Sequence, residues 1–295
     1  PAAGSRGGLR GRCAGGPEGP SGTRLSAGCL AHRGVLITSM LAASAAVIVV
    51  LMVVVWLISL VARDASIVDI VWGAGFVVVA ATATIVGDGP AARRYLILGM
   101  VTVWGLRLAA YLAWRNLGHG EDYRYVAMRK HWGERFWWVS LFTVFGLQGV
   151  LMWVVSLPVQ LSVIAVVPAD LGPLAALGVV VGAIGFGFET IGDAQLARFK
   201  ADPANEGQVM DQGLWHYTRH PNYFGDFCVW WGIFLVAAET GPGRWGIVGP
   251  VVMSILLMRG SGVPMLEKTI GKRRPGYAEY AARTSAFFPR PPKQA

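Results

Sequence analysis

Two carboxylates lie four residues apart inside the long apolar stretch that covers residues 171–198. At that spacing Glu189 and Asp193 share one face of a helix. Ionisable side chains inside a membrane are costly and usually serve a function. We therefore interpret both carboxylates as functional groups, and Arg198 and Lys200 follow them at the end of the same stretch.

The densest group of polar residues is the segment 213–226, GLWHYTRHPNYFGD. Pro221 is typical of the first turn of a helix, where its missing N–H is not needed. Asn222 and Asp226 then lie on one face of that helix, with Tyr223 beside them. This arrangement places an amide, a carboxylate and a phenol at the start of a membrane helix.

Arg219 and His220 come directly before this helix start. The free N–H groups of a helix N-terminus favour anions, and two basic side chains strengthen that preference. The segment therefore predicts a site for a phosphate-bearing or otherwise anionic cofactor. A capped helix start, with two bases that reach the membrane surface, explains the same residues equally well.

The composition indicates that these groups belong to a membrane protein. Of the 295 residues 54% are hydrophobic and only 15% are charged, whereas soluble domains carry about a quarter charged residues. The net charge of +9 comes from bases scattered between apolar runs, which disfavours nucleic acid as a partner. Neither the 3 cysteines nor the 5 histidines show metal-ligand spacing, so we expect no metal site.

Seven apolar stretches are each long enough to cross about 30 Å of hydrocarbon. They are residues 35–62, 66–87, 94–117, 136–160, 171–198, 222–240 and 244–262. We therefore predict an all-α polytopic membrane protein with about seven transmembrane helices. Lys and Arg concentrate after the first, third and fifth stretches and in the C-terminal tail, which places the C-terminus in the cytoplasm, the N-terminus on the opposite side, and the cofactor pocket of the C-terminal half open to the cytoplasm.

The domain organisation predicted from these stretches is simple. Residues 1–33 are rich in Gly, Pro and Arg and cannot bury enough apolar surface to fold, so they are predicted to form a disordered tail. Residues 34–290 form a single membrane domain, and residues 291–295 form a short tail. We expect the cell membrane, of a bacterium, as the location.

The segment Tyr217–Asp226 resembles the signature segment of the steroid 5-alpha-reductase/sterol reductase superfamily. Residues 60–290 as a whole resemble the bacterial branch of that superfamily known as the DUF1295 family. The supporting motifs are Trp104–Arg107 (WGLR), Glu121–Tyr125 (EDYRY) and Tyr277–Tyr280 (YAEY), with Phe288 and Pro289 closing the match.

This resemblance implies an enzyme that takes NADPH from the cytoplasmic side and reduces a carbon–carbon double bond, in an enone, of a lipophilic substrate. Asp193 matches an acid that contacts the nicotinamide–ribose part, and Asn222 and Asp226 match positions close to it. Lys200 stands where the reductases often have a phosphate-binding Arg, so the charge is kept without the bidentate geometry. The other cofactor-binding positions that the resemblance implies are Arg198, Tyr217, Arg219, His220, Tyr223, Arg259, Tyr277 and Tyr280.

The substrate side of the site matches the superfamily less well. Steroid reductases pair a helix-2 acid with a helix-3 Tyr that donates a proton toward the substrate ketone. The nearest counterparts here are Asp69 and Trp104, and Trp has no proton to give. Either Tyr111, two helical turns further on, takes this role with Asp69 and Arg107 as catalytic partners, or the substrate differs. Asp69 and Arg107 are equally well explained as an intramembrane ion pair. Further polar candidates for the same cavity are Tyr125, Gln148 and Glu189.

Two other functions remain open. Membrane methyltransferases of the isoprenylcysteine carboxyl methyltransferase type share the Arg-His-Pro-x-Tyr helix start, which would make S-adenosylmethionine the cofactor. Glu267 stands alone where those enzymes show two adjacent Glu residues. A non-catalytic protein that binds sterols or other membrane lipids is the third reading, and Trp104 is its best support. In every case the expected partners are a lipophilic small molecule and the membrane lipid, and the oligomeric state stays open.

Overall fold

The computed structural model describes residues 27–260, 262–264, 267, 270–271 and 274–293. Every regular element in these ranges is helical, which confirms the predicted all-α class. The described helices are α2 (Ala27–Ala62), α3 (Ile67–Val86), α4 (Ala91–Asn116), α5 (Tyr123–Trp132), α6 (Phe136–Ser140), α7 (Leu147–Val155), α8 (Leu157–Ser162), α9 (Pro173–Ala201), α10 (Pro221–Ala238), α11 (Gly241–Arg244), α12 (Val248–Met258) and α14 (Tyr277–Arg283). Short 3-10 or π turns lie at Gly133–Arg135, Leu141–Gly146, Pro203–Asn205, Gly213–His216 and Trp245–Ile247.

Six helical segments among the described residues are long and apolar enough to cross a membrane. They are Gly34–Ala62, Ile67–Val86, Ala91–Asn116, Tyr123–Val155, Pro173–Ala201 and Gly241–Met258. The chain is therefore a polytopic membrane protein. Helix α10 has 18 residues but is not among the six, because polar residues such as Asn222 and Asp226 lower its hydropathy. The seventh span, and with it the orientation, stays a prediction.

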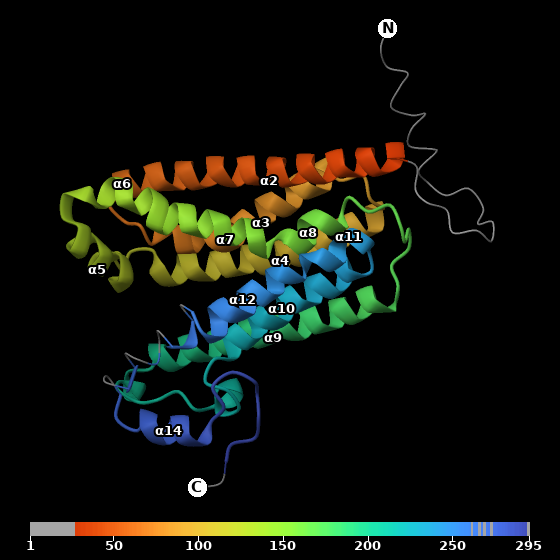
Figure 1. The fold of residues 1–295 in the computed structure, drawn as a ribbon. Helices are drawn as coiled ribbons and strands as arrows, with labels where there is room; N and C mark the ends of the chain where they lie inside the picture. Colours follow the sequence, from red (N-terminus) through yellow and green to blue (C-terminus); the bar gives the residue numbers. More distant parts are fainter. Residues whose placement is uncertain (1–26, 261, 265–266, 268–269, 272–273, 294–295) are drawn as a thin grey trace.

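Two helix boundaries differ from the sequence prediction. Helix α2 begins at Ala27, inside the segment 1–33 that we predicted to be disordered; residues 1–26 of that segment lie outside the described ones. The second difference is helix α5, which lies between the predicted stretches 94–117 and 136–160; the chain turns after it at Gly133, with a positive φ of 53°, before α6 begins at Phe136. Figure 1 shows α5 on one side of this turn, folded back beside α6 and α7.

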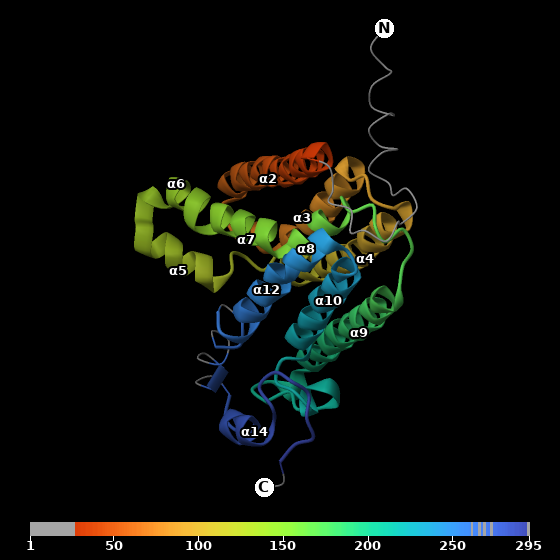
Figure 2. The same cartoon turned by 45° about the vertical axis from the view of Figure 1, so that its right-hand side comes forward.

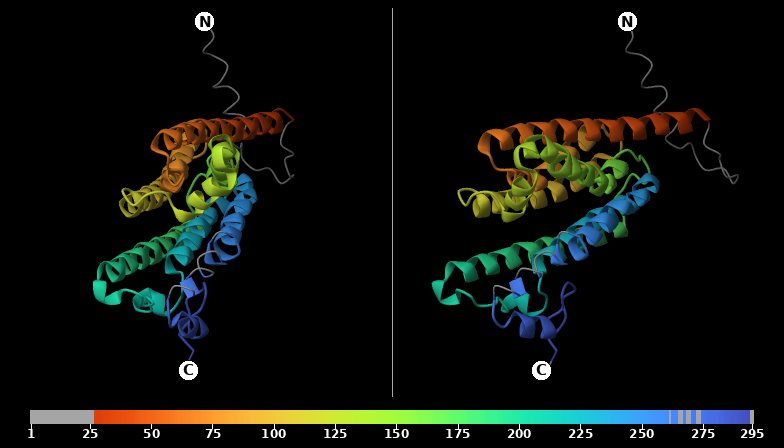
Figure 3. Two further views of the ribbon diagram at one scale, coloured as in Figure 1. Left: turned by 90° about the vertical axis from the view of Figure 1, so that its left-hand side faces the viewer. Right: turned by 60° about the vertical axis from the view of Figure 1, so that its left-hand side comes forward.

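The long helices form two groups that are inclined to each other. Helices α2, α3, α4 and α7 make one group, and α9, α10 and α12 make the other, as Figure 1 and Figure 2 show. The tightest pairs are α9 with α10 and α3 with α4, whereas α4 touches α9 more sparingly. The two groups diverge toward the end of the molecule where α14 lies (Figure 3).

Small residues let α9 and α10 pack backbone to backbone. A Cβ atom added to Gly185 would lie 2.5 Å from the carbonyl oxygen of Gly225, and one added to Gly178 would lie 2.6 Å from that of Gly232. Such close approach is the ordinary use of Gly between membrane helices. It brings the polar C-terminal half of α9 directly against the polar start of α10.

An aromatic core fills the junction of α3, α4 and α10. The rings of Trp104 and Trp230 meet nearly at right angles with centroids 5.3 Å apart, and Phe76 lies 4.6 Å from Trp230. All three side chains are at most 1% exposed. Trp104 is therefore a core residue, and its large ring takes the volume that a smaller Tyr would leave empty.

The end of the chain folds back over the start of α10. The Thr218 hydroxyl donates to the carbonyl of Phe287 at 2.8 Å, and the backbone N–H of Arg219 donates to the carbonyl of Ser285 at 2.9 Å. The Arg290 N–H donates in turn to the carbonyl of Tyr217 at 3.0 Å. These bonds tie the segment after α14 to the loop that carries the predicted cofactor motif.

Candidate functional site

A charged network inside the membrane domain centres on Arg107 of α4. Its Nη1 donates to Glu189 Oε1 at 2.8 Å, and its Nη2 donates to Asp193 Oδ2 at 2.5 Å and to the Glu189 carbonyl at 3.0 Å. Glu189 and Asp193 are 3% and 4% exposed. The two acids that share a face of α9 thus act together on one guanidinium group.

Helix α10 completes the network. Asn222 donates from Nδ2 to Asp193 Oδ1 at 3.2 Å, and its own Oδ1 accepts from the Tyr223 N–H at 3.1 Å. Asp226, one turn further along, acts electrostatically on Glu189, Asp193 and Arg107. Three predicted cofactor-binding residues, Asp193, Asn222 and Asp226, and the predicted catalytic Arg107 therefore lie together.

An open groove of about 330 Å³ runs beside this network between α4 and α9. Tyr111 lies at its wall with two guanidinium groups over its ring, those of Arg107 at 5.4 Å and of Arg115 at 5.8 Å. The residues that line the groove are Arg107, Tyr111, Trp114, Thr190, Asp193, Ala194, Ala197 and Arg198. Charged groups (Arg107, Asp193 and Arg198) and aromatic rings (Tyr111 and Trp114) line the same groove, which suits an amphiphilic ligand.

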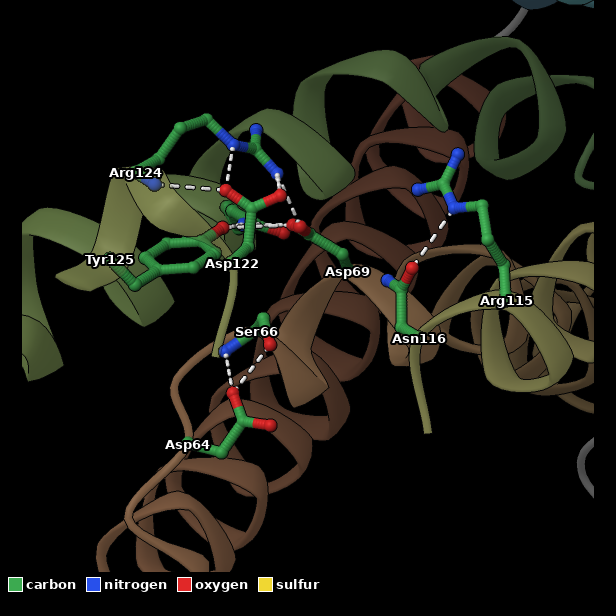
Figure 4. Close-up of polar contacts among 9 residues, drawn as sticks. Asp64, Ser66, Asp69, Arg115, Asn116, Asp122, Arg124 and Tyr125 are labelled. Atoms are coloured by element: carbon green, nitrogen blue, oxygen red, sulfur yellow. Dashed lines mark hydrogen bonds and ion pairs between the residues drawn. The ribbon is translucent and has the colours of Figure 1, made fainter. Parts of the chain in front are cut away.

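Asp69 does not pair with Arg107, so the ion pair predicted as one reading of these residues is wrong. Asp69 Oδ2 accepts from Arg124 Nη2 at 2.6 Å, and its Oδ1 accepts from the Tyr125 hydroxyl at 2.8 Å. Figure 4 shows the three side chains facing one another between α3 and α5. The physical reason is that α5 folds across the start of α3 and supplies a nearer guanidinium, while Arg107 is already held by two acids on α9.

The EDYRY motif builds the surroundings of Asp69. Asp122 accepts from Arg124 Nε at 2.9 Å, and Glu121 accepts from Arg129 Nη2 at 2.7 Å and from the Ala65 N–H at 2.8 Å. Burial alone would raise the pKa values of Glu121 and Asp122, but their bonds to Arg129 and Arg124 outweigh it and lower both. The motif therefore holds two ionised acids that fix α5 against the start of α3.

Gln148 and Tyr125, which the sequence offered only as further candidates, join the Asp69 cluster. The Gln148 amide donates to the Tyr125 hydroxyl at 3.3 Å and lies 3.5 Å from Asp69 Oδ1. A π-helical turn at Leu141–Gly146 directly precedes Gln148 and sets its direction. Such turns are frequent at functional positions in helices.

A third polar cluster joins the C-terminal segment to the start of α10. Glu267 Oε1 lies 3.1 Å from both Arg219 Nε and His220 Nε2. The His220 ring stacks on the Tyr223 ring, with centroids 5.4 Å apart. Burial raises the pKa of Tyr277 to about 12, with a further contribution from the Glu267 charge, so this phenol is neutral at physiological pH.

The hydroxyl of Tyr280 donates to the carbonyl of Trp215 at 2.5 Å, and the Trp215 indole donates to the carbonyl of Gly192 at 2.9 Å. Tyr280 therefore connects α14 to α9 one residue before Asp193. Its hydroxyl bonds a backbone carbonyl and its ring packs against that of Tyr277, so its observed role is to position the end of the chain.

Four of the predicted cofactor-binding residues are exposed and lie outside the hydrogen-bonded Arg107 network. Tyr217 is exposed and packs its ring against His216, and Arg259 is exposed at the end of α12. Lys200 and Arg198 are exposed at the end of α9, where the charges of Arg115 and Arg274 act on Lys200. Their role at a cofactor site stays a prediction.

Sequence reasoning missed Arg115 and Arg124. Arg115 follows Arg107 by eight residues on α4, which places both on one helix face, so the spacing could have indicated it. Arg124 lies inside the EDYRY motif, but its partner Asp69 is 55 residues away in the sequence. Only the fold of α5 over α3 makes that contact visible.

Glu267 should make the stability of the protein depend on acid pH. Burial alone would raise its pKa, but the hydrogen bond with His220 and the charges of Arg219 and His220 lower it overall. A lowered folded-state pKa stabilises the protein above the unfolded Glu pKa of about 4.3, and this stabilisation is lost as the pH falls through the lowered value. We expect a loss of about 1.5 kcal/mol from this contact, the lower end of the range for hydrogen bonds to charged groups, because Glu267 is partly exposed.

The measurement is the apparent Tm of the detergent-purified protein as the pH falls from about 6 to about 3, a range that covers carboxylate titration. Glu267→Gln should show a flatter acid limb than the parent protein. The control is Glu279→Gln, an exposed acid on α14 that should keep the parent slope. Equal slopes for Glu267→Gln and the parent would contradict the expected contribution.

The helices and the buried network define a polytopic membrane protein with a charged site enclosed between its helices. The chain belongs to the DUF1295 family, described as a protein of unknown function, which matches residues 55–284 and falls in the steroid reductase-like group. This confirms the resemblance drawn from the segment Tyr217–Asp226.

An uncharacterised protein of Schizosaccharomyces pombe is 25% identical to this chain over 231 residues. The match covers 69% of this chain and 66% of the yeast protein, so the chain spans just under two thirds of that relative's length. No solved structure matches the chain.

Proposed function

We propose that this protein is a membrane oxidoreductase that transfers a hydride from NADPH to the carbon–carbon double bond of a lipophilic enone. The observation that carries the proposal is the contact of Asp193 with both Arg107 and Asn222 beside the groove between α4 and α9, which Arg107 and Asp193 line. These are the residues that the resemblance to steroid reductases assigns to the reacting end of the cofactor and to the substrate.

The chemistry of the surrounding side chains fits a dinucleotide. Arg115 and Arg274 act on Lys200 as like charges, and Asp193 is the acid that offsets them there. An excess of positive charge at the ends of α4 and α9 suits the phosphates of NADPH. We assign phosphate contacts to Lys200, Arg198 and Arg219, and contacts with the nicotinamide–ribose part to Asp193 and Asn222.

NADPH supplies the hydride when it is bound; the protein orients the reactants and handles the proton. Arg107 fixes the Asp193 carboxylate, so that this acid presents one geometry to the cofactor. Tyr111 is the candidate donor to the substrate carbonyl oxygen, because the guanidinium groups of Arg107 and Arg115 over its ring stabilise the phenolate that remains. The buried rings of Phe76, Trp104 and Trp230 exclude water on the inner side.

Direct binding of NADPH and of S-adenosylmethionine to the detergent-purified protein, measured side by side, tests this function. Binding of NADPH with no binding of S-adenosylmethionine supports the reductase and justifies a screen of lipophilic enones. The reverse result overturns it in favour of methyl transfer. If neither cofactor binds, the non-catalytic lipid-binding reading replaces both.

Asn222→Ala should weaken NADPH binding at least tenfold, a change of about 1.4 kcal/mol, because it removes the amide that holds Asp193. Asp193→Ala should act in the same direction. The matched control is Glu134→Ala in the turn between α5 and α6, an exposed position away from the groove. Unchanged affinity in both site variants, with normal expression, would remove the assignment of this site.

A methyltransferase keeps one specific observation in its favour. Glu267 lies beside Arg219 and His220, so the His-Pro helix start and the late Glu that such enzymes share are in contact here. If S-adenosylmethionine binds, Glu267→Gln should weaken that binding and leave any NADPH binding unchanged.

A further inference from the structure

The Arg107 network contains more acid than base. One guanidinium group, from α4, faces three carboxylates: Glu189 and Asp193 of α9 and Asp226 of α10. Asn222 adds a neutral amide from α10. If all three acids were ionised, the network would carry a net charge of −2 among membrane helices, where even one uncompensated charge is costly.

Close packing presses two of these acids together. A Cβ atom added to Gly225 would lie 2.7 Å from Glu189 Cβ and 2.5 Å from the Glu189 nitrogen. Asp226 is the next residue on α10, and its charge acts on Glu189. The two helices cannot separate at this point without loss of their Gly contacts, so Glu189 stays against the turn of α10 that carries Asp226.

The hydrogen bonds show which of the three carboxylates have oxygens without a donor. Both oxygens of Asp193 have donors, Arg107 and Asn222. Glu189 Oε2 and Asp226 Oδ1 are buried and make no hydrogen bond of standard geometry; the Trp104 indole N–H, which acts on Glu189, is a neutral donor and adds no positive charge. Buried ionised carboxylates normally have hydrogen-bond donors on both oxygens. With one Arg against three acids the network is two positive charges short, and one shared proton lowers its net charge from −2 to −1.

We infer that Glu189 and Asp226 share one proton at neutral pH and form a proton-binding site in the membrane interior, while Asp193 stays ionised. This leaves the network with one negative charge fewer and gives the orphaned oxygens an O–H. Among the described residues no group of three or more His, Cys, Asp or Glu side chains is arranged to hold a metal ion. A proton can compensate negative charge without a cluster of metal ligands.

The charge of the bound cofactor should control the protonation of this acid pair, and this part of the inference rests on the proposed function. The nicotinamide ring of NADP⁺ is cationic and that of NADPH is neutral, and the proposed site for this ring, Asp193 and Asn222, belongs to the same network. A cation there replaces the shared proton as the compensating charge. The O–H bond of the acid pair then breaks and the proton leaves to the buffer, with no change of oxidation state.

Infrared spectroscopy tests the proton without any cofactor. The purified protein at neutral pH should show the C=O band of a protonated carboxylic acid, shifted in heavy water. The band should be lost in the double variant Glu189→Gln/Asp226→Asn, whose amides have the shape of the neutral acids and should preserve the apparent Tm. The matched control is Glu239→Gln, a buried acid with Arg93 at 3.6 Å, which should keep the band. A parent protein without the band, or a double variant that retains it, overturns the inference.

Calorimetry in two buffers of different ionisation enthalpy tests the coupling to the cofactor. Binding of NADP⁺ should release up to one proton per protein molecule, binding of NADPH should release none, and the double variant should release none with either. NADP⁺ binding without proton release overturns the coupling. If neither nucleotide binds, the proposed function fails, and the infrared band alone still decides whether the pair holds a proton.

Discussion

Arg107→Met should lower the free energy of unfolding by about 3–5 kcal/mol, the usual cost when one partner of a buried ion pair is removed. Arg107 holds Glu189 and Asp193, which are both nearly inaccessible to solvent, and bonds the Glu189 carbonyl as well. Without the guanidinium group, carboxylates remain buried with no positive charge beside them. The measurement is the apparent Tm and the yield of monodisperse protein in detergent.

Two further variants separate this mechanism from a general effect of losing an Arg. Arg135→Met, at an exposed position before α6, should change the apparent Tm by no more than the roughly 0.5 kcal/mol expected of surface substitutions. Arg107→Met combined with Glu189→Gln, Asp193→Asn and Asp226→Asn should recover most of the stability, because all three acids that face Arg107 are then neutral. An Arg107→Met protein as stable as the parent would show that the network does not hold the helices together.

Most of the fold could be predicted from the sequence, because a membrane-spanning helix requires only a long apolar stretch. About 20 apolar residues in a row satisfy their own backbone hydrogen bonds and cover the hydrocarbon, so stretches such as 66–87 and 94–117 matched α3 and α4 closely. The turn at Gly133 falls in the gap between the predicted stretches 94–117 and 136–160, whereas helix α5 in that gap was not predicted, because its 10 residues are too short and too polar to read as a membrane span. Whether helix α10 spans the membrane stays a prediction, because the polar residues of its candidate site also lower its mean hydropathy.

The site was predictable where its residues are local in sequence. The spacing of Glu189 and Asp193 placed both on one face, and the start of α10 placed Asn222 beside them once the two helices packed. The partner of Asp69 could not be obtained in this way. Its nearest base depends on the path of α5 over α3, and a contact between residues 55 apart leaves no periodic signal.

Gly225→Ala should disrupt both the fold and the site, because the new methyl group has no room. The added Cβ would meet the Gly185 carbonyl oxygen at 2.6 Å and the Glu189 nitrogen at 2.5 Å, and both are backbone atoms that cannot rotate away. Overpacking of this kind costs about 1–3 kcal/mol, and relief requires α9 and α10 to move apart. That movement stretches the hydrogen bond from Asn222 to Asp193, so NADPH binding should weaken along with the apparent Tm.

Gly187→Ala, on the facing helix α9, is the matched control. A Cβ atom there meets nothing within 4 Å, and Ala is favoured over Gly in helices by up to about 1 kcal/mol, so this variant should be as stable as the parent or more so. Comparison of the two variants isolates the helix crossing as the cause, since the chemical change is identical. If Gly225→Ala keeps the parent Tm but loses NADPH binding, the crossing serves mainly to place Asn222 against Asp193. The opposite result is a Gly225→Ala protein that loses stability while its surviving folded fraction still binds NADPH with parent affinity. In that case the cofactor contacts do not depend on the spacing of α9 and α10, and the assignment of Asn222 to the site is wrong.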